Sequence, residues 1–206
     1  MGDILSTYLR TIGSRFTLGL GFMALLFSAQ TQSVAITTIT ATVVASSCVG
    51  RIVSGVQRST VGIIDFGVIN AKTKAAPVRP FSLLLSEYAD GEIGCSAFRA
   101  YAQQQNIATL TFGDLSQTQL DSQGVITRYS DDSASPIRIQ VAPRNQEAQF
   151  VQPGGPGYIT AGFNQLQYPV DFATKGQFDF IASLTGLGQA KAGSFTGALT
   201  LTVAYR

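Results

Sequence analysis

The residues best able to do chemistry in this sequence are two cysteines and one pair of adjacent carboxylates. The sequence contains no histidine, so it cannot build a Ser-His-Asp or Cys-His arrangement or a histidine ligand for zinc or iron. Asp131 and Asp132 stand in a run of turn-forming residues. Neighbouring side chains in such a stretch point apart, which places this pair poorly for sharing a proton. We therefore expect no enzyme activity, no catalytic residues, no metal site and no cofactor.

The first 35 residues have the layout of a secretory signal peptide. Arg10 and Arg15 precede an apolar run at 16–27, which is shorter than the ~20 residues of a membrane-spanning helix. The pattern of small residues favours cleavage after Ala35, and cleavage as early as Ala29 is an alternative. We expect residues 36–206 to form a single exported domain.

Export also gives an expectation for the two cysteines. An even pair in an exported chain indicates a disulfide, here between Cys48 and Cys95. In the chain-entropy account, closing a loop of this length contributes about 4 kcal/mol to stability. A metal site is the weaker alternative, because two cysteines without histidine rarely complete a set of four ligands.

The charge balance indicates no nucleic-acid partner. Only 13% of the residues are charged, and the formal net charge is +2. Recognition of a phosphate backbone needs a dense basic surface, and no such cluster of charges stands out along the chain.

Short runs rich in β-branched and aromatic residues recur along the chain, with turn residues between them. This spacing predicts an all-β sandwich or barrel without a convincing helix after residue 35. The expected strands before the C-terminal stretch are 36–45, 51–55, 59–69, 81–88, 107–113, 124–129, 136–142, 148–151, 165–172 and 178–184.

The last fourteen residues are the stretch around which the rest is organised. Leu199, Leu201, Val203 and Tyr205 alternate with small or hydroxyl-bearing residues. A period of two predicts a half-buried strand, and the sequence stops on it at Arg206.

This ending resembles that of chaperone–usher fimbrial subunits, the pilins of type 1 and P pilus-like fimbriae. Their C-terminal signature has a glycine fourteenth from the end, alternating apolar residues and a penultimate tyrosine, which correspond here to Gly193, the alternating residues and Tyr205. The likeness extends over the mature chain, including the Asp65-Phe66-Gly67-Val68 turn. It departs at Tyr88, where the family usually has cysteine, since Cys95 comes seven residues later.

The resemblance implies an incomplete immunoglobulin-like β-sandwich that lacks its last strand and is completed by donor-strand addition. The acceptor edge would be residues 194–205, with Leu199, Leu201, Val203 and Tyr205 beside the groove and the Arg206 carboxylate as the chaperone's anchor. The implied partners are a periplasmic pilus chaperone, an outer-membrane usher and neighbouring subunits. The implied location is a cell-surface fimbria reached through the periplasm, and a minor subunit is favoured.

The same resemblance places a donor arm before Cys48. Ile39 falls where the family's arm carries a large apolar residue, and Thr37 and Ala35 continue its face. Cleavage after Ala35 would leave a short arm, whereas cleavage near Ala29 would leave one of ordinary length.

Two other functions are compatible with an exported β-rich chain. A small outer-membrane β-barrel fits the number of strands, but the chain has no tryptophan for an aromatic girdle. An exported single-domain binding module, similar to an adhesin, is the second alternative.

Overall fold

The computed structural model describes residues 33–43, 48–54, 62–69, 76–88, 91–102 and 107–205. Residues 31–206 cluster as one unit. Each strand expected from the sequence has a counterpart, and the short β6 is an addition. The strands are β1 (Ser33–Val43), β2 (Val49–Ser54), β3 (Ile63–Ile69), β4 (Arg79–Ser86), β5 (Ile107–Phe112), β6 (Leu120–Asp121), β7 (Gly124–Tyr129), β8 (Ala134–Pro143), β9 (Gln149–Phe150), β10 (Gln165–Pro169), β11 (Gln177–Thr185) and β12 (Phe195–Tyr205).

The strands form an open, mostly antiparallel sheet. Its main path runs β2-β4-β11-β8-β7-β12-β5-β10-β9. Outside this path, β6 pairs with β7, and β1 pairs with β3 on one side and β12 on the other. Among the described strands, the pairing of β1 with β12 is parallel, and the other pairings are antiparallel.

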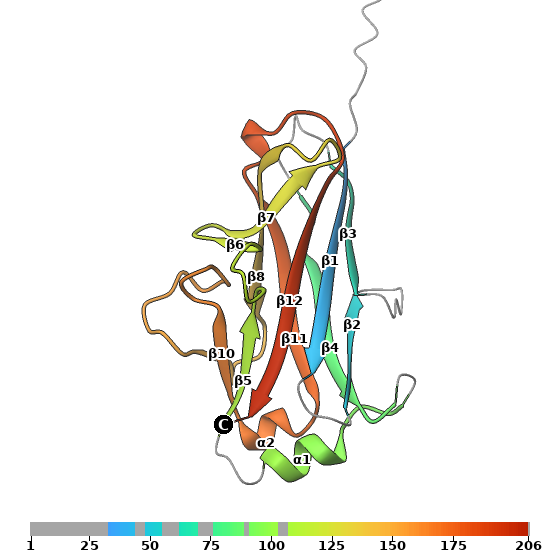
Figure 1. Ribbon diagram of the computed structural model, residues 1–206, viewed down its shortest axis with the longest axis vertical. Helices are drawn as coiled ribbons and strands as arrows, with labels where there is room; N and C mark the ends of the chain where they lie inside the picture. The colour runs from blue at the N-terminus through green and yellow to red at the C-terminus, as the bar shows by residue number, and fades with distance from the viewer. Residues whose placement is uncertain are drawn as a thin grey trace, which may run out of the picture. The chain divides into compact units, whose positions relative to one another are not determined.

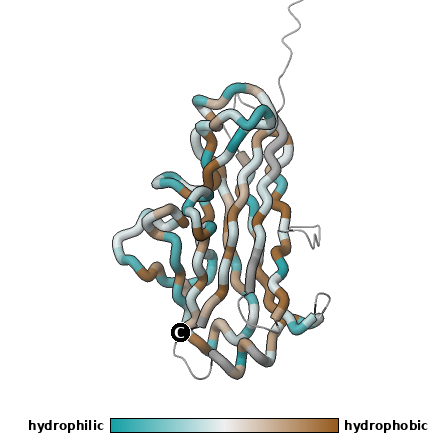
Figure 2. Tube along the Cα trace, in the orientation of Figure 1, coloured by the Kyte–Doolittle hydropathy of each residue, from teal (hydrophilic) through white to brown (hydrophobic). Residues whose placement is uncertain are grey.

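The core brings together strands that are not neighbours in this order, such as β11 and β5. The ring of Phe180 on β11 packs edge-on against Phe112 of β5, with ring centroids 5.6 Å apart, and stacks on Phe81 of β4 at 5.2 Å. All three rings are almost fully buried, and burying such a side chain stabilises the fold by ~1.5–3 kcal/mol. Apolar and polar residues alternate along the long strands (Figure 2), as strands with one buried face require.

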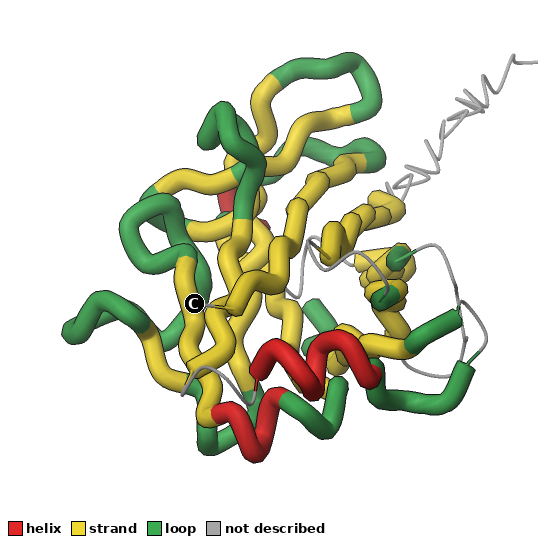
Figure 3. The backbone as a smooth tube through the Cα atoms, turned by 60° about the horizontal axis from the view of Figure 1, so that its bottom comes forward, coloured by secondary structure: helices red, strands yellow, loops and turns green. Residues whose placement is uncertain are grey.

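Two short helices correct the expectation of a chain without helices. These are α1 (Ser96–Ala102) and α2 (Val170–Ala173), which lie together at one end of the sheet (Figure 3); a single 3₁₀ turn, η1 (Leu187–Gln189), precedes β12. The strand expected at 165–172 therefore ends at Pro169. Proline has no N–H to continue a ladder, and the chain turns directly into α2. None of the described helices is long and apolar enough to cross a membrane.

The disulfide between Cys48 and Cys95 is confirmed. Their Cα atoms are 5.8 Å apart, and Cys95 is buried. The bond joins the residue before β2 to the residue before α1, bridging 47 positions. Tyr88, at the position where the fimbrial family usually has cysteine, is 72% exposed, and Cys95 forms the bond from the residue just before α1.

Candidate functional site

Strand β12 carries the alternation that the sequence predicted. Phe195, Leu199, Leu201 and Val203 are buried, whereas Thr196 and Ala198 are exposed. Gly193 lies just before the strand with a φ of +147°. One face of β12 therefore belongs to the core and the other faces solvent.

One edge of β12 is shared by two partner strands. Its first residues, Phe195–Gly197, pair with β7, and Leu201–Tyr205 pair with β5. The gap between these pairings is closed by Gln119, whose side-chain oxygen accepts the backbone N–H of Thr200 at 2.7 Å. The backbone N–H of Gly113 donates to the Thr200 carbonyl at 2.8 Å. This edge of β12 is thus supplied with hydrogen-bond partners from the middle of the chain.

The other edge of β12 is covered by β1, from the opposite end of the sequence. Residues Ala35–Val43 run parallel to Phe195–Val203, with Ile39 beside Leu199. The far edge of β1 pairs antiparallel with β3, so β1 fills the space between β3 and β12 (Figure 1). The sequence predicted an open edge at residues 194–205. In the structure, the chain's own N-terminal residues satisfy the N–H and C=O groups that an open edge would leave unpaired.

The side chains of β1 divide between the core and solvent. Thr37 and Ile39 are 0% and 2% exposed, whereas Thr38 and Thr40 are exposed. The hydroxyl of Thr37 is buried without a hydrogen-bond partner in the described part of the chain. The backbone of Ala35 pairs with Phe195 and Gly67. Two of the three residues expected on the arm's inward face are therefore buried beside β12.

A close backbone contact holds β1 on the side of β3. The N–H of Ile39 donates to the carbonyl of Gly62 at 2.7 Å. Gly62 has a φ of +63°, and a Cβ at this position would lie 2.1 Å from the Ile39 carbonyl oxygen. Such an approach requires glycine, which tolerates positive φ and has no side chain. The strands therefore meet at a distance that only this residue permits.

The remaining predicted residues lie at or beyond the limits of the described chain. Tyr205 pairs through its backbone with Ala108, whereas its side chain and the whole of Arg206 lie outside the described residues. The predicted signal peptide also lies outside them, except for its last three residues, which begin β1. Val44 and Ala45, the end of the first expected strand, are not described either.

Sequence reasoning did not identify β3 as the second neighbour of β1. Ile64 and Phe66 of β3 are buried, and β3 pairs with β1 through residues that include Ile64. A single signal was available, the isolated glycine at position 62 just before a β-branched run, because such glycines often mark a close backbone approach.

The carboxylate pair has the surroundings of a solvated turn. The side chains of Asp131 and Asp132 are 60% and 89% exposed. Hydrogen bonds from Ser133 and from Lys191 lower the pKa of Asp131 to about 2, so its carboxyl is ionised at neutral pH and holds no proton to donate. The described residues contain no cluster of three or more potential metal ligands.

Comparison with known proteins adds one finding to this geometry. Residues 23–206 match the family described as K88 fimbrial protein A, and this span includes both β1 and β12. No curated protein matches the sequence significantly.

Proposed function

Because the chain belongs to the K88 fimbrial protein A family, a family of chaperone–usher fimbrial subunits, we propose that it assembles into its fimbria by strand addition along β12. Membership implies a structural, non-enzymatic subunit of a surface fimbria with pilus-assembly partners. The proposal concerns how assembly occurs. It identifies the groove between β3 and β12 as the acceptor and the residues before Cys48 as the donor.

One observation carries this proposal: one edge of β12 is paired along most of its length with a strand from the other end of the sequence. Ala35–Val43 pair with Phe195–Val203, and no short turn joins the two strands. A strand held by backbone pairing and by alternate side chains can be replaced by another strand with the same pattern. Without β1, this edge would expose unpaired N–H and C=O groups together with the apolar side chains of β12.

The proposed partners follow from the strand that each would supply. A periplasmic chaperone would cover the β12 edge first, with the Arg206 carboxylate as its anchor, and would deliver the subunit to an outer-membrane usher. The arm of a neighbouring subunit would then replace the chaperone's strand. In this proposal, the chain is an incomplete immunoglobulin-like sandwich related to the type 1 and P pilus-like pilins, exported through the periplasm, and a minor subunit of its fimbria.

The length of the arm depends on where the signal peptide is cleaved. Strand β1 begins at Ser33, and Ser33 and Val34 pair with Ile69 and Val68. Cleavage after Ala35 would remove the first three residues of β1, whereas cleavage near Ala29 would preserve the strand. We therefore propose the earlier position, which N-terminal sequencing of the mature protein tests directly.

Strand acceptance can be tested with the full chain and a labelled peptide. The mature protein is unfolded and refolded with a fluorescent peptide of residues 33–43, and co-elution is measured by size-exclusion chromatography. The peptide is used unchanged, with Ile39→Asp and with Thr40→Asp. Ile39 is buried and Thr40 is exposed, so the unchanged and Thr40→Asp peptides should co-elute, and the Ile39→Asp peptide should not.

The two charged peptides differ only in the face that carries the carboxylate. Burying an unpaired charge is costly, whereas the same charge on the solvent face costs little. The proposal is overturned if no peptide co-elutes with the protein or if all three are retained equally.

A further inference from the structure

The inward face of β1 contains a polar defect. Thr37 is fully buried, and its hydroxyl has no hydrogen-bond partner among the described residues. Its backbone pairs with Gly197 on one side and Ile64 on the other. A buried hydroxyl that loses its bonds to water without gaining others destabilises the state that buries it. The inserted form of β1 therefore carries a penalty at one identifiable atom.

The same residue type elsewhere in β1 carries no such penalty. Thr38 and Thr40 belong to the same strand and are exposed, so water can satisfy their hydroxyls. Threonine suits a strand backbone at all three positions. Each of these threonines therefore favours the extended backbone to the same degree. Only Thr37, whose hydroxyl is buried, adds a free-energy cost of lost hydrogen bonds to water.

The position of Thr37 makes this cost specific to the closed state. It stands two residues before Ile39, whose N–H is bonded to Gly62 and whose backbone is beside Leu199. When β1 leaves the groove, the Thr37 hydroxyl regains water, whereas the apolar residues of the strand lose their burial. The hydroxyl opposes insertion, and the apolar residues favour it.

We infer that Thr37 determines how strongly this chain occupies its own groove, and that the groove prefers a strand with an apolar β-branched residue at that position. The closed subunit is stable enough to cover β12, yet its own strand is replaceable by a better-matched one. This inference rests on the proposed strand addition and names the residue that sets its specificity. The fitting partner is an extended segment that carries valine or isoleucine where β1 carries Thr37.

The first test compares two substitutions in the full mature chain. Thr37→Val replaces the buried hydroxyl with a methyl group of similar size, and Thr40→Val makes the same change on the exposed face. Thr37→Val should raise the thermal midpoint by about 2–6 °C relative to Thr40→Val, because the defect is removed only at residue 37. Equal shifts for the two variants, or a lower midpoint for Thr37→Val, would overturn the inference.

The second test measures the preference of the groove. The labelled 33–43 peptide competes with the chain's own strand during refolding of the wild-type protein, either unchanged, with Thr37→Val or with Thr40→Val. Retention of the Thr37→Val peptide should be about tenfold greater than that of the other two. If all three are retained equally, the inference fails and strand acceptance stands. If none is retained, strand acceptance itself fails, and the thermal comparison still decides whether Thr37 weakens the closed form.

Discussion

Ile39 and Leu199 occupy paired positions on the parallel strands β1 and β12, and both side chains are buried. The pair joins the two ends of the sequence within one core. The N–H of Ile39 is simultaneously bonded to Gly62 on the β3 side. Ile39 is therefore a point at which β1 is held on both sides, by pairing with Leu199 of β12 and by the hydrogen bond to Gly62 beside β3.

This relationship predicts a large and coupled loss of stability when either side chain is shortened. Ile39→Ala and Leu199→Ala should each reduce the free energy of unfolding by about 2–5 kcal/mol, since each removes buried apolar contacts and leaves a cavity. A double-mutant cycle by urea denaturation should give a coupling of at least ~0.5 kcal/mol. Thr40→Ala, on the exposed face of the same strand, is the control and should change stability by no more than ~0.5 kcal/mol. Strict additivity of the two losses would contradict direct packing of the pair.

The disulfide provides a second prediction. Replacing both Cys48 and Cys95 with alanine should reduce stability by about 4 kcal/mol, because the 47-residue separation that the bond closes becomes unconstrained in the unfolded chain. The urea midpoint with and without reductant measures the effect. Reductant should destabilise the wild-type protein to a similar extent and leave the double variant unchanged. A loss below ~1 kcal/mol would mean that the disulfide contributes little to the free energy of unfolding.

The alternation along β12 was predictable because it is local. Leu199, Leu201 and Val203 face the core at every second position, and a period of two in the sequence is enough to predict one buried face. The disulfide was predictable because export and an even pair of cysteines leave few alternatives. Both features depend on residue type and spacing alone.

The partner of β12 was not predictable in the same way. Strand β1 is far from β12 in sequence. Several strands of the chain have an alternating pattern, and the sequence does not show which of them pairs with the edge of β12 or that the pairing with Phe195–Val203 is parallel. The helix α2 was missed for a different reason. Val170 and Phe172 are good strand residues, but Pro169 ends the ladder and the backbone turns. The unpartnered state of the Thr37 hydroxyl emerges only from three-dimensional packing.

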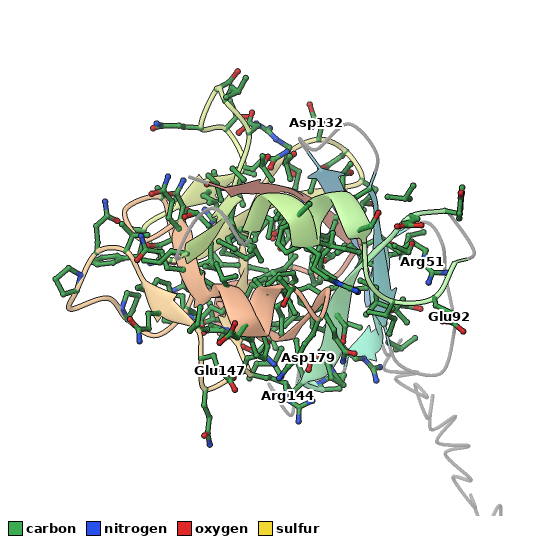
Figure 4. All side chains as sticks on the ribbon, turned by 90° about the horizontal axis from the view of Figure 1, so that it is seen from below. Arg51, Glu92, Asp132, Arg144, Glu147 and Asp179 are labelled. Atoms are coloured by element: carbon green, nitrogen blue, oxygen red, sulfur yellow. A yellow bond between two sulfur atoms is a disulfide. The ribbon has the colours of Figure 1, made fainter. Side chains whose placement is uncertain are left out.

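Asp179 provides a prediction about pH. Burial acts to raise the pKa of its carboxyl, but hydrogen bonds from Ser82, Gln177 and Asn145 and the charge of Arg144 outweigh burial, so the pKa is lowered. In Figure 4, Asp179 and Arg144 lie on the same side of the molecule. A lowered pKa gives stability that is present above the carboxyl's ordinary value, near ~3.9, and is lost as the pH falls through the folded-state value.

Asp179→Asn should therefore cost about 1 kcal/mol at pH 7, after allowance for solvent screening, and less near pH 3. Urea denaturation at both pH values measures the difference. Asp132→Asn is the matched control, because that side chain is 89% exposed and asparagine tolerates the φ of +61° found there. A penalty for Asp179→Asn that is the same at both pH values would contradict a role for the ionised carboxylate.

Gly62 provides the sharpest test of the way β1 is held. A Cβ at residue 62 would lie 2.1 Å from the carbonyl oxygen of Ile39, so Gly62→Ala must displace either β1 or the backbone of residue 62. Gly154 has a similar φ of +79°, but a Cβ there would meet nothing within 4 Å, so Gly154→Ala isolates the cost of the backbone conformation, about 1–2 kcal/mol. Gly62→Ala should exceed that cost by ~2 kcal/mol or more, measured by urea denaturation. If the two alanine variants were equally stable, the close approach of Gly62 would not hold β1 in place.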